Sequence, residues 1–248
     1  MNEWKTASDG PLKLNSNEID IWLFHLNTSP PRIKHFYPLL SDDEKERSEK
    51  FINFIHRKRF IASHGFMRST LSRYTGIPAE KLVFKKADNG KPFLAIDNNS
   101  PAIRFNLSHS HNMALLGVCL ENELGVDIEY MERKNDWRGI IKRFFTDVEQ
   151  TSIFSLADDQ QQNAFFKTWT RKEAHMKVTG QGLRLSPTQF TISTPPDKPQ
   201  LISYIKDDTV DINQWSMSDI EMPELANQYC ACLSYQGIIN RINQYICI

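Results

Sequence analysis

The chain has 248 residues, of which 40% are hydrophobic, and its 30 basic residues are balanced by 30 acidic ones. This composition supports a packed core and excludes a disordered chain, and a net charge of zero gives no global field that would attract nucleic acid or an anionic membrane. The beginning of the chain lacks the pattern of a signal peptide, and no stretch of about 18 to 20 apolar residues could span a bilayer. We therefore expect a cytoplasmic monomer that acts without nucleic acid or membrane. The four cysteines form no CxxC pair, so we do not expect zinc.

The first third of the chain predicts a strand followed by helices. Residues 19–26 (IDIWLFHL) have the composition of a buried strand, and the prolines of residues 29–31 (SPP) predict a turn after it. Residues 41–76 predict a pair of helices, because Ser41 and Glu44 have the spacing of a capping box and the segment ends on glycine. This part of the chain is therefore predicted to be helical outside its first strand.

The rest of the chain alternates groups of strands and helices. An Asn-Gly pair within residues 82–96 predicts a hairpin, and residues 102–130 contain up to three more strands. Residues 136–157 and 161–178 have helical patterns, the second ended by a glycine-rich stop. Strands segregated from helices in each half predict an α+β fold. Further strands are predicted at residues 189–194, 199–205 and 228–235.

Two carboxylates share one face of the strand predicted at residues 125–130. Side chains alternate along a strand, so Asp127 and Glu129 point to the same side, roughly 6 to 7 Å apart. Such a pair is usually a solvated polar face, and it can also hold one cation. Whether the pair is a solvated face or part of a cation site depends on which other residues face the two carboxylates.

A third carboxylate interrupts the apolar stripe of the helix predicted at residues 161–178. The stripe runs through Phe166, Trp169 and Met176, and Glu173 occupies the position between them. Alternatively, Glu173 only skirts the core and pairs with Lys177 at i,i+4 spacing. Together with the strand pair, it would complete a site for Mg²⁺ or Mn²⁺ rather than zinc, since all three ligands are carboxylates.

Candidate phosphate-binding groups occur in three other parts of the sequence, and each of them also has a purely structural interpretation. Ser108 and His109 are predicted just past a strand end, where they could reach a ligand or simply lie in a surface turn. Lys91 follows the hairpin glycine, where lysines also keep sheet edges soluble. The basic run at residues 56–60 could equally be a solvated helix face.

Four short motifs, in order along the chain, bring these candidates together. This set resembles the 4′-phosphopantetheinyl transferases of the Sfp type, over roughly residues 40–185. The resemblance implies an enzyme that transfers the phosphopantetheine arm of coenzyme A to a serine of an apo acyl or peptidyl carrier protein and releases adenosine 3′,5′-bisphosphate. The motifs are residues 89–92 (NGKP), 105–110 (FNLSHS), 125–129 (GVDIE) and 169–174 (WTRKEA), followed by Lys177 and Gly180.

The resemblance also implies roles for single residues. Asp127, Glu129 and Glu173 match the family's Mg²⁺-binding carboxylates, with Mn²⁺ as an alternative ion. Glu173 also matches the residue that deprotonates the serine, directly or through water, and Lys177 matches the lysine on the reacting phosphates. The matches to contacts with the phosphates of coenzyme A are Arg59, Lys91, Ser108 and His109, with Lys45 and Arg47 as candidates for its 3′-phosphate.

The family's fold implies a pseudo-dimeric, two-lobed α+β chain with the active site in the cleft between the lobes. We expect an amino-terminal lobe at residues 1–118 that contacts the phosphates of coenzyme A. The second lobe, residues 119–248, would hold the metal-binding carboxylates and contact the carrier, with residues 131–143 as the recognition surface. Ile140 and Ile141 there could meet a carrier helix or belong to the core. Fatty-acid, polyketide and nonribosomal-peptide carriers are all compatible with the sequence.

Two other hypotheses belong to different classes. A catalytically silent relative that only binds carrier proteins would be indicated by the loss of a carboxylate, and all three matched positions keep theirs. Another magnesium-dependent phosphoester enzyme, such as a nucleotide hydrolase, has no P-loop motif to support it.

Overall fold

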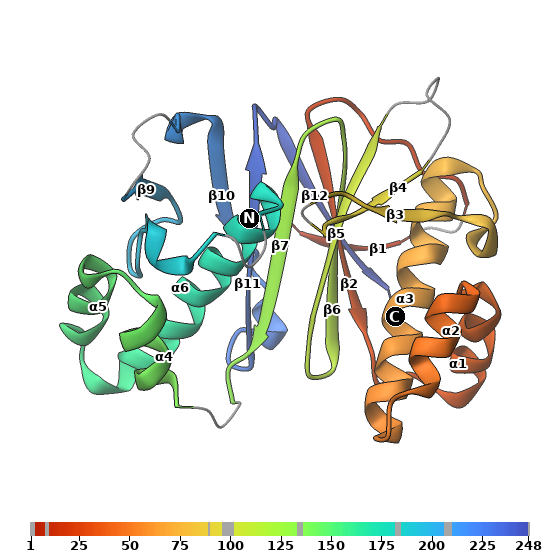
Figure 1. Cartoon of the computed structure of the whole chain (residues 1–248), viewed down its shortest axis with the longest axis horizontal. Coiled ribbons are helices and arrows are strands. Elements are labelled where there is room, and N and C mark those ends of the chain that lie inside the picture. The colour runs from red at the N-terminus through yellow and green to blue at the C-terminus, as the bar shows by residue number, and fades with distance from the viewer. Residues whose placement is uncertain are drawn as a thin grey trace. The chain divides into compact units, whose positions relative to one another are not determined.

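The computed structural model of the chain divides into two compact units (Figure 1). It describes residues 3–7, 10–88, 90–95, 102–132, 136–181, 185–205 and 210–247. The first unit comprises Met1–Lys86, Pro92–Glu121 and Ile239–Ile248, and the second comprises Ala87–Lys91 and Asn122–Ile238. The last ten residues, which the sequence-based division grouped with the second lobe, therefore lie with the first. Among the described residues, no helix is both long enough and apolar enough to cross a bilayer.

The first unit is built on a five-stranded sheet. Strands β2, β6 and β5 pair antiparallel, whereas β12 runs parallel to both β1 and β2. The sequence predicted β2, β5 and β6 but neither of the terminal strands. In sheet order the strands are β1 (Trp4–Thr6), β12 (Arg241–Cys247), β2 (Glu18–His25), β6 (Met113–Leu120) and β5 (Ile103–Ser110).

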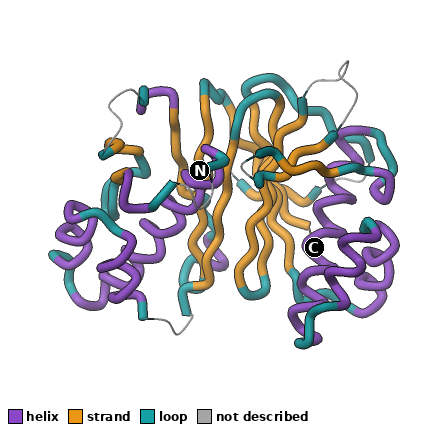
Figure 2. Tube along the Cα trace, in the orientation of Figure 1, coloured by secondary structure: helices purple, strands orange, loops and turns teal. Residues whose placement is uncertain are grey.

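Three helices accompany this sheet (Figure 2). Helix α1 (Pro30–Phe36) occupies the segment predicted as a turn, which is a correction. Proline at the first helical position loses no hydrogen bond and has a helical φ, so the pair of prolines starts a helix there. Helices α2 (Asp42–Glu49) and α3 (Phe54–Thr75) confirm the predicted pair, with the Ser41–Glu44 capping box formed.

The core of the first unit lies between α3 and the sheet. Phe24 of β2 stacks on Phe66 of α3 with ring centroids 4.5 Å apart, and Leu116 of β6 is fully buried in the same cluster. The predicted hairpin forms from β3 (Phe84–Lys86) and β4 (Pro92–Leu94), with Gly90 at a φ of 86°. Asn89 lies outside the described residues.

The second unit combines an antiparallel sheet with three helices. The order of the sheet is β10 (Trp215–Asp219), β11 (Tyr229–Gln236) and β7 (Leu124–Tyr130), and a separate pair is formed by β8 (Phe190–Ile192) and β9 (Leu201–Tyr204). The helices are α4 (Trp137–Phe144), α5 (Asp147–Phe154) and α6 (Asp158–Thr179). Both units mix helices with mainly antiparallel sheets, which confirms the α+β class. Short 3₁₀ turns occur at Tyr37–Leu39, Ala79–Lys81, Pro187–Gln189, Ile212–Gln214 and Pro223–Leu225.

The helical prediction for residues 136–157 is refined by the structure. A capping box of Thr146 and Glu149 starts α5 directly after α4, so the segment forms two helices. Ile141 is fully buried and Ile140 is half-buried against the same cluster, which favours the core interpretation over exposure to a partner. Helix α6 ends at Gly180 in the left-handed conformation, as predicted, while Gly182 lies outside the described residues.

Candidate active site

Strand β7 and helix α6 bring the three predicted carboxylates together in the second unit. The contact between these two elements depends on Gly125. A Cβ at this position would lie 2.3 Å from the carbonyl oxygen of Ala174 and 2.4 Å from the backbone nitrogen of Val178. Any side chain would therefore push the strand away from the helix, because heavy atoms cannot approach so closely. Glycine thus sets the short spacing across which Asp127 meets the residues of α6.

The pKa of Glu173 reports the electrostatic environment of this group of acids. Burial raises its pKa to about 7, and the negative charges of Asp127 and Glu129 act in the same direction, while the charge of Lys177 opposes them. The three carboxylates therefore share one electrostatic environment. That arrangement is unfavourable for three ionised acids and favourable for a bound cation.

Lys177 supplies one positive charge to the cluster. Its ammonium donates hydrogen bonds to Oδ1 of Asp127 at 2.6 Å and to the carbonyl oxygen of Val126 at 3.2 Å. Asp127 is only 4% exposed, so this ion pair is poorly screened by solvent. Lys177 thus reaches across to β7, and its charge also acts on Glu173, which is the partner that the i,i+4 spacing predicted.

The position of Glu173 on α6 differs from the sequence-based expectation. The helix is buried on most of its circumference, so it has no single apolar stripe. Trp169, Glu173 and Lys177 are half-buried and follow each other at i,i+4 spacing. Glu173 therefore lies on the strip of the helix that keeps access to solvent, rather than in a core-facing slot.

The residues fit a magnesium ion that is held jointly with a substrate. Among the described residues, no three or more His, Cys, Asp or Glu side chains are arranged so that they could hold a metal alone. Mg²⁺, however, binds proteins through one or two carboxylates and completes its shell with waters and substrate phosphates. The mutual repulsion that contributes to the raised pKa of Glu173 is the property such an ion would relieve.

Lys91 lies in the second unit and is not a solvated edge lysine. Its ammonium is 2.6 Å from Oε2 of Glu123, and it also donates to the carbonyl oxygens of Leu124 and Val178 at 3.1 and 3.3 Å. The side chain is 15% exposed. Lys91 therefore ties the turn of the hairpin to the start of β7 and to the last turn of α6, where a cation also complements the helix dipole.

Three other predicted residues gather in the first unit. Arg47 lies over the ring of Phe60, 5.3 Å from its centroid, and the same ring stacks on His64. Burial lowers the pKa of His64 to about 4, and the positive charges of Arg47 and His109 lower it further against the raising effect of Glu44. These groups thus form a cationic cluster around a neutral imidazole. Arg59, on the same helix as Phe60, donates to Oδ1 of Asn112 at 2.7 Å.

Lys45 and Ser108 are the two other candidates in the first unit. Lys45 pairs with Asp42 at 3.3 Å, within α2. The prediction that Ser108 and His109 follow a strand end is wrong, because β5 continues to Ser110. The alternation along the strand buries Ser108 and exposes His109.

Sequence reasoning missed two ion pairs beside Glu173, of which one is fully buried and the other is buried on the side of its arginine. The ammonium of Lys172 lies 2.6 and 2.8 Å from the two carboxylate oxygens of Glu149, and both side chains are 0% exposed. Arg171 donates to both oxygens of Asp219, at 3.0 and 2.7 Å. The two residues that precede Glu173 therefore anchor α6 on two sides. The signal was available in the sequence, since two adjacent cations in a buried helix need partners.

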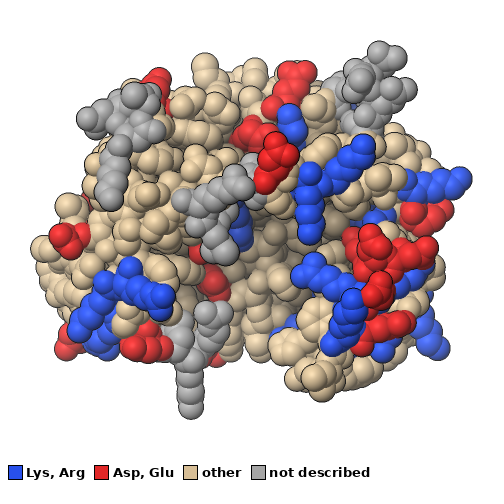
Figure 3. Space-filling model, viewed as in Figure 1, with Lys and Arg blue, Asp and Glu red and all other residues tan. Residues whose placement is uncertain are grey.

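Over the face seen in Figure 3, acidic and basic side chains are interspersed, as the balanced composition predicts. Groups of opposite sign gather around α2, where Lys45 pairs with Asp42 and Lys50 with Glu46. This face therefore presents no extended field of one sign, and recognition of an anion depends on local groups.

Comparison with known proteins gives consistent matches over both units. The family model described as 4′-phosphopantetheinyl transferase superfamily matches residues 123–233, and the model of the amino-terminal part of 4′-phosphopantetheinyl transferases matches residues 26–120. The transferase HetI of a Nostoc species is 35% identical over 205 residues, which cover 79% of this chain and 86% of that protein. The transferase gsp of Aneurinibacillus migulanus is 28% identical, over 85% of this chain and 84% of that one. A holo-(acyl-carrier-protein) synthase from Bacillus anthracis, solved with coenzyme A, has a TM-score of 0.37 and 17% identity, and covers 46% of this chain and 94% of its own.

Proposed function

The chain belongs to the 4′-phosphopantetheinyl transferases, and from this premise we propose how its residues transfer the phosphopantetheine arm of coenzyme A to a serine of an apo carrier protein. The observation that carries the proposal is that the negative charges of Asp127 and Glu129 contribute to the raised pKa of Glu173, so the three carboxylates lie close enough to interact. A cluster of carboxylates beside a lysine suits phosphoryl chemistry, in which the protein positions the reactants and stabilises charge.

Glu173 is the general base of the proposed reaction. A base must be ionised before it can accept a proton, and a cation beside Glu173 would favour the ionised form against the burial and repulsion that raise its pKa. Glu173 accepts the proton of the carrier serine, directly or through one water. The serine oxygen then forms a bond to the phosphorus of the phosphopantetheine group, and the bond to the second phosphate breaks. Adenosine 3′,5′-bisphosphate leaves with the electron pair.

Asp127, Glu129 and Glu173 would hold Mg²⁺, or Mn²⁺ in its place. When bound, the ion supplies positive charge to the pyrophosphate. Lys177 lies next to Asp127 and supplies a second positive charge, with ammonium hydrogens that can be shared with a phosphate oxygen. Lys177 thus stabilises the growing negative charge on the leaving group from the protein side.

Recognition of coenzyme A is assigned to both units. In the first unit, Arg47, Arg59 and His109 are the proposed phosphate contacts, together with Lys45 and Ser108. In the second, Lys91 retains this proposed role, although its ammonium is held by Glu123 and would have to exchange partners. We also propose that the chain acts in the cytoplasm as a monomer and that its carrier belongs to a fatty-acid, polyketide or nonribosomal-peptide pathway.

Intact-protein mass spectrometry tests the proposal. An apo acyl carrier protein is incubated with the chain, coenzyme A and Mg²⁺, and with EDTA in a parallel sample. The expected result is a gain of one phosphopantetheine mass that EDTA prevents. If carriers of all three classes gain no mass from a folded sample that binds coenzyme A, the silent carrier-binding relative becomes the better hypothesis.

A further inference from the structure

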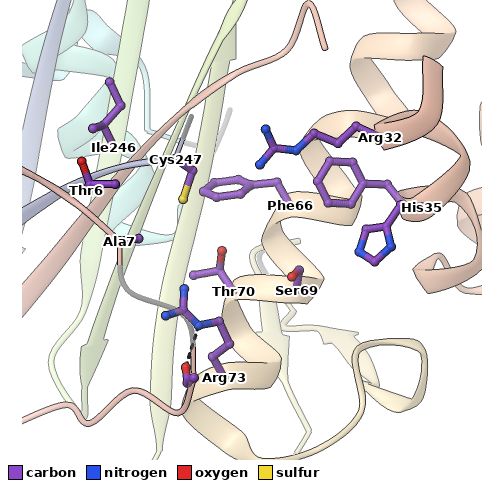
Figure 4. A pocket seen from close by; sticks show the side chains of 12 residues that line it. Thr6, Ala7, Arg32, His35, Phe66, Ser69, Thr70, Arg73, Ile246 and Cys247 are labelled. Carbon is purple, nitrogen blue, oxygen red and sulfur yellow. Dashed lines mark hydrogen bonds between the residues drawn. The ribbon is translucent and has the colours of Figure 1, made fainter. Parts of the chain in front are cut away.

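Two hollows in the described surface differ in how their charged side chains are held. In the first unit, a pocket between α1, α3 and the end of β12 contains Arg32 and Arg73 (Figure 4). Arg73 donates to the carbonyl oxygen of Gly10 at 2.8 Å, and Arg32 lies over the ring of Phe24, so groups of the chain itself hold both arginines. In the second unit, a groove of about 1040 Å³ contains Lys167, which forms no ion pair with any described residue.

This groove lies beside the outer edge of the sheet of the second unit. Its walls come from α6, from the loop at residues 195–199 and from β10, which is the edge strand of the order β10-β11-β7 (Figure 1). Met217, Ser218 and Asp219 all line it. Consecutive residues of a strand point to opposite faces of the sheet, so a groove that touches three in a row runs along the edge of the strand rather than over one face.

The hydrogen bonds of β10 leave backbone groups on its open side. The N–H of Ile220 donates to the carbonyl oxygen of Ala231 at 2.9 Å, so hydrogen bonds to β11 are made at this position. Hydrogen-bonded pairs alternate along an antiparallel ladder, which pairs Ser218 with β11 and turns the N–H and C=O groups of Met217 and Asp219 toward the groove. Among the described residues, no backbone group bonds to these four. An open edge of this kind is a template for a further strand.

The loop wall of the groove cannot close this edge as a regular strand. Pro195, Pro196 and Pro199 lie there, and proline has no N–H to donate to a neighbouring strand. Together with Leu156 and Ala164, these prolines give the groove apolar surface. A ligand must therefore bring its own backbone donors and acceptors, and its side chains can be partly apolar.

The charged residues of the groove favour an acidic ligand. Lys167 of α6 is half-buried and without an ion pair among the described residues. Arg171, one turn further along α6, is instead held by both carboxylate oxygens of Asp219 and by two backbone carbonyl oxygens. The other charged residues are exposed, where solvent screening makes their pairs weak, so Lys167 decides the preference. These exposed residues are Asp159, Asp197, Lys198 and Glu221.

We propose that the groove binds an extended peptide segment of a protein partner, which adds as a strand to β10 and places one acidic side chain against Lys167. The segment exchanges hydrogen bonds with the backbone of Met217 and Asp219, which gives affinity without regard to sequence. Its carboxylate accepts a charge-assisted hydrogen bond from the ammonium of Lys167, which gives selectivity for an acidic segment. Because β10 has five residues, a segment of about five to seven residues covers the edge.

Fluorescence anisotropy with labelled peptides tests the proposal. The first probe is the capped heptapeptide Val-Ser-Val-Glu-Val-Ser-Val. A second probe has Gln in place of Glu, and a third has proline at its third and sixth positions, which removes an N–H from each edge of the added strand. The Glu probe should bind, the Gln probe should bind about tenfold or more weakly, and the proline probe should not bind. The test needs neither coenzyme A nor a carrier protein, so its result is independent of the proposed transfer.

Lys167→Gln and Lys198→Gln form a matched pair of variants. Lys167→Gln should bind the Glu probe about tenfold or more weakly than the wild type, whereas Lys198→Gln, in the exposed loop wall, should bind it equally well. If Lys167→Gln does not fold, the preference of the wild type for the Glu probe over the Gln probe decides the role of the charge. Circular dichroism establishes that each sample is folded.

Amide hydrogen exchange locates the bound peptide. The amides of Met217 and Asp219 should exchange more slowly when the Glu probe is bound, because their N–H groups then donate to the added strand. The proposal is overturned if the folded wild type does not bind the Glu probe, if it binds the Gln or the proline probe equally well, or if the slowed amides all lie outside β10.

Discussion

Helices α3 and α6 are alike in length and ending but differ in what they bury. Each has 22 residues and ends at a glycine with positive φ, 69° at Gly76 and 65° at Gly180. The buried side chains of α3 are mostly apolar, with Phe60, Phe66 and Leu71 among the largest. Helix α3 thus acts mainly as a support for the core of the first unit.

Helix α6 instead buries charges along the turn that carries Glu173. Lys172 and Arg171 are almost fully buried against Glu149 and Asp219, while Glu173 itself stays partly open. Buried ion pairs add little net stability, but they fix geometry once formed. The comparison teaches that α6 is held mainly by polar contacts beside the carboxylate proposed as the base, whereas α3 is held mainly by apolar packing and by one buried cation, Arg68.

The largest expected effect is the loss of transfer rate when the carboxylate of Glu173 is replaced by an amide of the same shape. Glu173→Gln should lower the rate of phosphopantetheine transfer by about 10² to 10⁴-fold, because a general base is lost while the shape is kept. The mass-spectrometric assay measures this rate. Glu224→Gln, at an exposed position of the same unit, serves as the matched control and should leave the rate unchanged. An unchanged rate in Glu173→Gln would remove this residue from the reaction.

The next effect concerns the buried cations of the two helices. Lys172→Met leaves Glu149 charged and fully buried, and should lower the free energy of unfolding by about 3 to 5 kcal/mol. In α3, Arg68→Met leaves Glu44, which is 16% exposed, so water can replace part of the lost contact and the loss should be smaller. Urea unfolding of both variants compares them.

The double variant Lys172→Met, Glu149→Leu sharpens this comparison. It removes both charges and should recover part of the stability that Lys172→Met loses, since Glu149 also accepts hydrogen bonds from the backbone nitrogens of Thr146 and Ile192. Transfer by the folded double variant should still be slower than in the wild type, since the anchor beside Glu173 is gone. If Lys172→Met and Arg68→Met lost equal amounts of unfolding free energy, the buried cations of the two helices would be equally important for stability.

Helices α3 and α6 can also be compared at two glycines, Gly65 and Gly125, where a neighbouring element packs closely against each helix. A Cβ at Gly65 of α3 would lie 2.3 Å from Cβ of Phe36, and a Cβ at Gly125 would lie 2.3 Å from the carbonyl oxygen of Ala174. Either alanine should reduce stability by about 1 to 3 kcal/mol through overpacking. Only Gly125→Ala should also slow transfer by the folded protein, by about tenfold or more, because it shifts Asp127 relative to Glu173. If both Gly65→Ala and Gly125→Ala slowed transfer, the slowing could not be assigned to the spacing between Asp127 and Glu173.

Local signals in the sequence predicted much of the fold. Capping residues and terminal glycines bounded α2, α3 and α6, because these signals act within one turn of a helix. The two prolines that begin α1 were misread, since proline is compatible with both a turn and a first helical turn. The pairing of β12 with β1 and β2 joins the two ends of the chain, and no local pattern specifies a contact so distant in sequence.

The site was predictable in its residue types but not in its contacts. Alternation on β7 correctly placed Asp127 and Glu129 on one face. The expected position of Glu173 in an apolar stripe of α6 was wrong, although the residue does lie near the two carboxylates of β7. The spacing allowed by Gly125 depends on tertiary packing, as does the ion pair between Lys91 and Glu123. Periodicity describes which face a residue occupies, and it does not tell which groups lie opposite.

The smallest expected effect is the dependence of stability on pH that the side chain of Glu173 contributes from α6. The pKa of Glu173 is raised to about 7 in the folded protein from the ordinary value of 4.5, so the unfolded chain binds fewer protons between these values. Without metal, folding stability should therefore fall as the pH rises through this window. Relative to the wild type, Glu173→Gln should gain about 1 to 2 kcal/mol at pH 8 and almost nothing at pH 4, after allowance for solvent screening. Urea unfolding in EDTA measures the difference. A gain that does not vary with pH would show that the glutamine acts through packing, whereas a gain confined to high pH would show that the carboxylate needed for transfer destabilises the fold that holds it.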